Sequence, residues 1–385
     1  MEMMGHAIRS LKKGRDVLSI AAALAVVLLP GALELGASAQ TPQPAPAAQL
    51  MAHGHYLRAQ RLVQAALAKN QKDLAALVDD SILQWAFFHN GEFLSVAQKA
   101  VATDGNSAAA HAQLTNALGL ELANSKASFM TRLNAAREYR KQLDLTLQLD
   151  PNNADAVQDL AEYEWHAPGM AGGDKAKAQQ GVDKLARIDA ARAYALRAEF
   201  AADETDKAKR QAAVEAVWKQ AVAALPGSYR AHAGLAAAYF DEGGAKLALA
   251  EQEAKKAEAV DATRIAAYQV LAEVYTSQGR WSDLDAELKR ARAGVPDDLS
   301  PEYKAASLIL TGNVGAQIAR AEAYLGDYLK QPAEGLEPPL ATAHWKYGLV
   351  LEKEGRKNDA VREVQVAVNM DGSLADAKKD LKRME

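Results

Sequence analysis

Few residues in this chain have the types and spacing that catalysis or metal binding requires. None of the 385 residues is a cysteine, which excludes thiol nucleophiles, cysteine zinc sites, iron–sulfur clusters and disulfides. His53 and His55 form an H-x-H pair, but no third ligand lies near it in the sequence. The remaining histidines after it lie far apart, at His89, His111, His166, His232 and His344. We therefore expect no metal and no cofactor.

The most unusual local sequence is HAPGMAGGDKAKA, residues 166–178. Its glycines could suggest phosphate binding, but it lacks the G-K-[ST] ending of a P-loop and follows no strand pattern. A structural loop is the favoured interpretation, with Asp174 capping the next helix. No G-x-S-x-G, H-E-x-x-H or supported S-x-x-K motif occurs. We expect no catalytic residues and no enzymatic activity.

Composition and charge favour a helical globular protein. Apolar residues make up 49% and charged residues 24% of the chain, and the net charge is -4 with a pI near 6.1. A nucleic-acid surface requires a basic field, so this acidic balance argues against nucleic acid as a partner.

Residues 1–39 have the pattern of a secretory signal peptide. A basic stretch containing Lys12 and Lys13 precedes an apolar run over 17–29, and Ala37-Ser38-Ala39 gives a small-residue cleavage site before Gln40. An uncleaved membrane anchor is the alternative, although the run is short for a bilayer. The following residues 40–49, rich in Pro and Ala, predict a flexible extended tether. We expect a periplasmic or secreted protein with no transmembrane span in the mature chain.

The rest of the chain repeats with a period near 34, most clearly over 265–298. There the spacing predicts a first helix whose buried face carries Tyr268, Leu271, Ala272 and Tyr275. Gly279 ends this helix. The second helix would bury Leu284, Leu288 and Ala291 and end before Pro296.

This unit resembles the tetratricopeptide repeat. Residues 341–374 and 229–264 match the same pattern, and weaker matches cover 50–71, 72–105, 107–151, 154–190, 190–227 and 302–335. A related Sel1-like hairpin, with a longer period, fits the central repeats less well. The resemblance implies an all-α fold, a right-handed α-solenoid of stacked antiparallel helix pairs over 50–385. We expect about nine pairs and a polar C-terminal capping helix.

The resemblance also implies a concave groove lined by the second, fifth, ninth and twelfth residues of the repeats. His111 and His232 fall at the fourth, packing position instead. The candidate groove contacts are Asp155, Gln158, Glu162, Trp165, Tyr194, Arg230, Phe240, Gln269, Glu273, Trp345 and Glu352. Such aromatic, charged and amide side chains suit peptide recognition. The Lys/Asn/Arg set that holds a terminal carboxylate in chaperone-binding relatives is absent in that form.

These observations predict a non-enzymatic scaffold or adaptor of a bacterial cell envelope, which binds another protein or an extended peptide. The bacterial source follows from the signal sequence and the style of the family resemblance. The alternative is a glycan or small-ligand module in envelope polymer biogenesis. That alternative requires exposed aromatic rings, for which Trp165 and Trp345 are the candidates.

Overall fold

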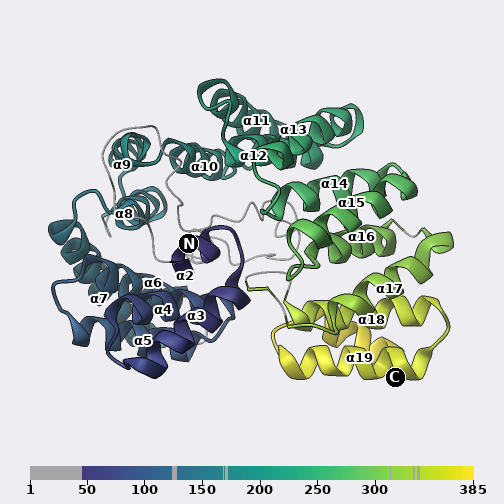
Figure 1. The fold of residues 1–385 in the computed structure, drawn as a ribbon, viewed down its shortest axis with the longest axis horizontal. Helices are drawn as coiled ribbons and strands as arrows, with labels where there is room; N and C mark the ends of the chain where they lie inside the picture. The colour runs from purple at the N-terminus through teal and green to yellow at the C-terminus, as the bar shows by residue number, and fades with distance from the viewer. Residues whose placement is uncertain are drawn as a thin grey trace. The chain divides into compact units, whose positions relative to one another are not determined.

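The chain folds into helices joined by short turns (Figure 1). The computed structural model describes residues 46–385 except 124–127, 168, 170–171, 313, 333 and 336–338. The predicted signal peptide and the cleavage site between Ala39 and Gln40 lie outside these residues. Contacts divide the chain into unit 1, up to Asp241, and unit 2, from Glu242. Each unit is described by itself.

Unit 1 contains helix pairs in chain order. They are α2 (Pro46–Ala52) with α3 (Tyr56–Lys69), α4 (Leu74–Ala86) with α5 (Asn90–Thr103), α6 (Ala108–Ala123) with α7 (Phe129–Leu149), α8 (Ala154–His166) with α9 (Lys175–Ile188), and α10 (Ala190–Ala201) with α11 (Lys207–Ala224). Helix α12 (Tyr229–Glu242) follows, and unit 1 ends within its last turn.

Unit 2 continues the same alternation. Its helices are α13 (Leu247–Val260), α14 (Ala266–Ser277), α15 (Trp281–Gly294), α16 (Ser300–Thr311), α17 (Ile318–Tyr328), α18 (Leu340–Lys353), α19 (Lys357–Met370) and α20 (Ala375–Met384). Short 3₁₀ turns, η2 (Gly244–Lys246) and η3 (Gly315–Gln317), precede α13 and α17. None of the helices in the described part of the chain is long and apolar enough to cross a membrane.

A recurring aspartate fixes the turn between one pair and the next. Asp150 ends α7, and its Oδ1 accepts a hydrogen bond from the Asn152 N–H at 3.0 Å. Asp261 after α13 and Asp371 after α19 accept in the same way from residues two positions later, at 3.0 and 2.8 Å. A carboxylate that bonds its own backbone two residues on stabilises a tight turn, so these residues fix where each new pair begins.

A side chain in the first turn of several first helices binds a backbone carbonyl of the turn before it. The Tyr268 hydroxyl donates to Ala262 O at 3.0 Å, six residues earlier. His232 Nε2 lies 2.9 Å from Pro226 O and His111 Nε2 lies 3.0 Å from Gly105 O, also six residues earlier. A carbonyl only accepts, so Nε2 carries the proton in both rings. The prediction that His111 and His232 are packing residues is confirmed, since both are buried.

Small residues allow the helices to approach closely. A Cβ on Gly181 would lie 2.8 Å from the Ala161 Cβ, between α8 and α9. A Cβ on Gly234 would lie 2.5 Å from the Trp218 ring, between α11 and α12. Alanines at such contacts, including Ala250 and Ala257 of α13, have no exposed surface. Large side chains fill the remaining gaps, and the core follows the helix contacts through each unit.

One local prediction was wrong. Of the predicted extended segment 40–49, residues 46–49 belong to α2, where Pro46 takes a first-turn position that tolerates proline. Gly91 lies inside α5 and does not form the turn before it. After α4, the residue with left-handed backbone is Phe88, whose φ is 61°. After α14 and α18 the corresponding left-handed residues are glycines, Gly279 and Gly355. A side chain at this φ strains the backbone.

We predict that Gly348→Ala destabilises the protein, because the new Cβ would lie 2.6 Å from Val364 Cγ2 and 2.9 Å from Ala360 O. The expected loss in free energy of unfolding is about 1–3 kcal/mol. Gly326→Ala is the matched control in the same unit. Its Cβ would meet only the Tyr347 hydroxyl at 3.9 Å, so helix propensity should stabilise it by about 0.5–1 kcal/mol. Urea unfolding measures both; equal effects would contradict the packing argument.

Candidate functional site

One face of α8 carries a row of polar side chains at helical spacing. Asn153 caps the helix by accepting from the Ala156 N–H at 3.0 Å, which sets the phase of the residues that follow. Asp155, Gln158, Asp159 and Glu162 then fall on one side of the helix. We call these four residues the α8 row.

Arg192 of α10 binds the first half of the α8 row. Its Nη1 lies 2.7 Å from Asp155 Oδ1, and its Nε donates to Gln158 Oε1. Gln158 Nε2 in turn donates to Glu162 Oε1 at 2.6 Å. The chain of contacts therefore passes from a guanidinium through an amide to a carboxylate. Arg192 is held in place by Asp189, which caps α10 by accepting from the Arg192 N–H.

Asp159, in the second half of the α8 row, receives no hydrogen bond from Arg192, although the guanidinium is near enough to lower its pKa in part. Asp159 is 1% exposed, and neither of its carboxylate oxygens has a hydrogen-bond partner among the described residues. Burial, with Asp155 nearby, raises the pKa of Asp159 to about 7. Burial and the carboxylates of Glu199 and Asp159 raise the pKa of Glu162 well above its usual range. Desolvation penalises the charged forms, and the like charges add to the penalty.

Trp165, at the end of α8, is part of a packed cluster. Its ring is parallel to that of Phe200, with centroids 4.2 Å apart, and Lys175 Nζ lies 4.3 Å from its ring centre. Two groups at this distance fit only on opposite faces of the indole. The indole N–H donates to Asp203 Oδ2 at 2.8 Å. Both faces and the polar edge of Trp165 are therefore occupied, which disfavours its predicted use as a glycan-stacking surface.

In unit 2, the neighbouring first helices α16 and α18 each contribute a lysine to a second group of polar side chains. Lys304 of α16 lies 3.5 Å from Glu273 of α14, and Lys346 of α18 donates to Ser307 Oγ at 2.8 Å. Lys346 also lies 4.5 Å from the centre of the Tyr303 ring. Burial, with Lys304 nearby, lowers the pKa of Lys346 to about 8. We call these five residues the lysine cluster.

The other predicted contacts have diverse surroundings. Gln269 donates to Ser300 Oγ at 2.6 Å. Trp345 donates its indole N–H to Asp380 Oδ2 at 3.0 Å, and Glu352 accepts two bonds from Arg383 at 2.5 and 2.7 Å. These two residues therefore hold the terminal helix α20. Tyr194 is half-buried, with Arg197 5.2 Å from its ring centre, and Phe240 is also half-buried. Gln158, Glu162 and Arg230 are buried. Asp155 is therefore the least buried of the α8 row.

Sequence reasoning missed Asp159, Lys304 and Lys346. Asp159 and Lys346 directly follow the predicted contacts Gln158 and Trp345. Successive residues lie 100° apart on a helix, so both can border one broad face. No contact was predicted within the repeat 302–335, and Lys304 is the fifth residue of α16, which begins at Ser300. The signal available in the sequence was a charged residue at, or directly after, a groove position of the repeat.

Within the loop at 166–178, Asp174 has the capping role expected for it. Asp174 caps α9 by accepting from the Ala176 and Lys177 N–H groups at 2.9 and 3.2 Å. Gly172 has φ 91°, which favours glycine. Within the described ranges, no cluster of three or more His, Asp and Glu side chains is placed to hold a metal ion.

No family model and no curated protein matches this sequence. Solved structures do show similarity. The yeast Tom70 crystal structure has a TM-score of 0.46 at 12% identity, with 88% of this chain and 86% of that chain covered. A tetratricopeptide repeat protein from Parabacteroides merdae has a TM-score of 0.38 at 14% identity, with 82% and 99% covered. Human IFIT1, as a dimer with PPP-AAAA, has a TM-score of 0.41 at 16% identity, with 84% and 70% covered.

These similarities concern the fold alone. The described helices pack as consecutive antiparallel pairs, with repeated turn aspartates and small residues at the helix contacts. The fold is all-α and of the tetratricopeptide-repeat type. The predicted fold class is thereby confirmed. The right-handed course of a superhelix stays a prediction.

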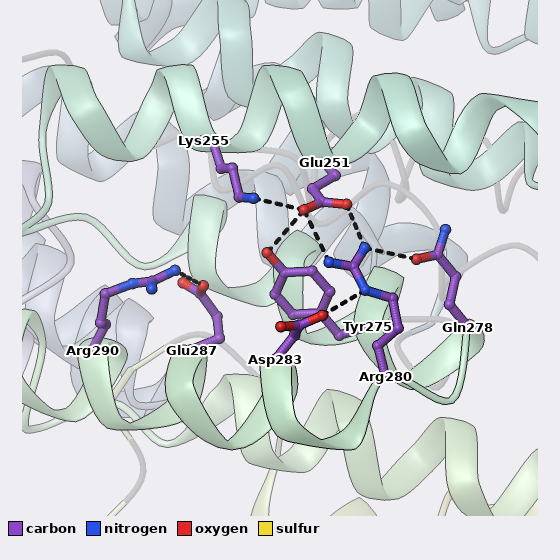
Figure 2. Close-up of polar contacts among 8 residues, drawn as sticks. All are labelled: Glu251, Lys255, Tyr275, Gln278, Arg280, Asp283, Glu287 and Arg290. Carbon is purple, nitrogen blue, oxygen red and sulfur yellow. Dashed lines mark hydrogen bonds and ion pairs between the residues drawn. The ribbon is translucent and has the colours of Figure 1, made fainter.

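A separate polar network joins α13, α14 and α15 and has a structural role (Figure 2). Arg280 Nη1 donates to Glu251 Oε2 at 2.6 Å, and Arg280 Nε donates to Asp283 Oδ2 at 2.6 Å. The Tyr275 hydroxyl and Lys255 donate to Glu251 Oε1 at 3.2 and 2.6 Å. The hydrogen bond from Arg280, followed by that from Lys255, lowers the pKa of Glu251 to about 2.

This network predicts a loss of stability in acid. Since the folded-state pKa of Glu251 lies below its usual 4.5, its stabilising contribution is complete above pH 4.5 and declines as the pH falls toward 2. Arg280→Met should cost about 1–2 kcal/mol at pH 7, discounted for the exposure of the guanidinium, and less at pH 3. Urea unfolding between pH 7 and 3 measures this. Arg362→Met, at a 72% exposed side chain, is the control and should change little; a pH-independent cost at Arg280 would contradict the assignment.

Proposed function

We propose that this chain is an exported, non-enzymatic scaffold of a bacterial cell envelope that holds another protein or an extended peptide along its first helices. The observation that carries this proposal is the distribution of polar side chains. Neighbouring first helices bring charged and amide groups together in the α8 row and in the lysine cluster, at or beside the positions that the repeat resemblance assigns to a groove. Such groups can bind backbone amides and side chains of a partner.

The scaffold interpretation is favoured over catalysis by how these groups are arranged. General acid–base or nucleophilic chemistry requires a nucleophile, a base and an orienting group within hydrogen-bond reach of one another. The α8 row offers carboxylates and one amide, with the guanidinium of Arg192 beside it, and the lysine cluster offers ammonium groups bonded to a hydroxyl and a carboxylate. These are recognition groups. The two tryptophans that a glycan module would use donate their indole N–H groups to Asp203 and Asp380.

We predict that a photo-crosslinking amino acid at Asp155 or Lys304 forms adducts with a discrete partner in the envelope fraction. Both positions lie on first helices and keep part of their surface, with side chains 24% and 22% exposed. The controls are Lys141 of α7 and Arg362 of α19, on second helices, with side chains 63% and 72% exposed. Adducts separated by electrophoresis and identified by mass spectrometry should come from the first-helix positions. Equal yields from all four positions would contradict binding along the first helices.

The export proposal rests on the sequence of residues 1–39, with its basic stretch, apolar run and A-x-A site. We predict that protein from the envelope begins at Gln40. Intact-mass and N-terminal peptide analysis measures this directly. Ala39→Leu should block cleavage, because the signal site requires a small residue there, and should leave the full-length chain. If the wild-type protein from the envelope retains residues 1–39, the segment is an uncleaved anchor instead.

A further inference from the structure

We infer that the inner end of the α8 row is a binding site for a cationic side chain, the ammonium of lysine or the guanidinium of arginine, presented by the bound partner. This inference rests on the proposed function and specifies its ligand. The groups that would form the site are Asp159 and Glu162 of α8 and the hydroxyl of Tyr139 of α7.

The argument begins with unsatisfied hydrogen-bonding capacity. Both oxygens of Asp159, Oε2 of Glu162 and the hydroxyl of Tyr139 are buried and have no partner among the described residues. Buried polar groups without partners are costly, and most folded proteins have few. Several such groups on neighbouring helices therefore indicate a site that a ligand completes.

The three side chains act on one another. Asp159 and Glu162 both raise the pKa of the Tyr139 hydroxyl, after burial, and Asp159 raises that of Glu162. The packing places the phenol beside the same stretch of α8, because the Tyr139 ring stacks on the Tyr163 ring with centroids 6.2 Å apart and packs in one cluster with Ala156. Asp159 lies between these two α8 residues, on the same side of the helix. Tyr139 is fully buried and lies on a helix other than α8. It is thus an observation independent of the acidic residues themselves.

The sign of the local charge determines the class of ligand. Asp155 raises the pKa of Asp159, and Asp159 and Glu199 raise that of Glu162. Arg192, which contacts Asp155 and Gln158, offsets only part of the rise at Asp159. An anion is therefore excluded by repulsion. A bare metal ion is disfavoured, because the described residues hold no group of three ligands placed for one. An organic cation with several N–H donors fits the remaining acceptors.

The α8 row also provides a direction of approach. The Asp155 side chain is 24% exposed, whereas Asp159 is 1% exposed and Glu162 has no exposed surface. A long side chain entering beside Asp155 would follow the row toward Tyr139. Lysine and arginine have the length and the terminal charge for such a path, with apolar stems that tolerate burial.

The test uses a random twelve-residue peptide display library selected on the immobilised full chain. The library is selected in parallel on the variant Asp159→Asn with Glu162→Gln. The control is Asp144→Asn with Asp183→Asn, which converts the same number of carboxyl groups to amides at side chains of unit 1 that are 56% and 58% exposed. We expect lysine or arginine at one recurrent position in peptides from the wild type and the control, and not in those from the variant.

Synthetic peptides from that selection give the quantitative readout. Calorimetry should show at least about tenfold weaker binding to the Asp159/Glu162 variant and less than twofold change for the control. Replacing the recurrent basic residue with glutamine should weaken binding to the wild type by a similar factor, and the two losses should not add. Tyr139→Phe preserves the packing and should weaken binding several-fold, which provides a second variant if the first unfolds.

The outcomes separate this inference from the proposed function. Enriched peptides that lack a basic residue, or that bind the Asp159/Glu162 variant as tightly as the wild type, would overturn the cation site while leaving a peptide-binding scaffold intact. If no peptide is enriched on the wild type and no crosslinked partner appears at Asp155, the scaffold function fails and the cation site fails with it.

Discussion

The structure depends on close approach between helices that cannot bury their apolar faces alone. Ala161 and Gly181 show the limit: one added methyl group would lie 2.8 Å from the Ala161 Cβ. Such contacts leave no room for polar side chains at the points where the helices approach most closely. Each pair still has an uncovered face, which the next pair covers, and so a helix pair gains stability mainly from its neighbours. The turn aspartates Asp150, Asp261 and Asp371 fix where each new pair begins.

This constraint explains where charge can gather. Because alanine and leucine occupy the closest helix contacts, charged residues lie on the outer faces or pair with the corresponding helix of the next repeat, as Lys304 does with Glu273 and Arg280 with Glu251. In the lysine cluster, Lys304 pairs with Glu273, and Lys346 contacts Ser307 and the Tyr303 ring. In the α8 row only Asp155 and Gln158 bind a cation. Burying the carboxyl groups of Asp159 and Glu162 without full hydrogen bonding costs stability, and the packing of the helices does not require these groups. A binding role accounts for their presence.

The sequence allowed much of the fold to be predicted, because the helix period and the punctuating residues are local. Gly279 and Asp174 take the positions that their residue types predict, and Tyr268 packs at the fourth position of its repeat. The strained Phe88 was not predictable, since its φ of 61° contradicts the preference of its residue type. α2 was missed because its proline-containing sequence favours extended structure except at a helix start.

The candidate site was predictable only in outline. Helical spacing identifies the face of α8 that carries Asp155, Gln158 and Glu162, and the contacts confirm that these residues share a network. The partners come from residues 34 or more positions away, as with Arg192 and Gln158 or Trp165 and Asp203. A repeat signature sets the number of residues between helices but not which side chains meet across them. For this reason Asp159 and Lys346, adjacent to predicted contacts, required the structure to be found.

The residues that contact Trp165 and Trp345 distinguish between glycan and polypeptide recognition. An indole exposed on a first helix could stack on a sugar or pack on the protein, and its position in the repeat is the same in both cases. Phe200 and Lys175 cover the two faces of Trp165, and Asp203 binds its N–H. Trp345 is bound by Asp380 and packs beneath α20. Since recognition of a flat sugar ring needs a free aromatic face, the polar groups of the first helices remain the better basis for recognition. Those groups suit the charges and amides of a polypeptide.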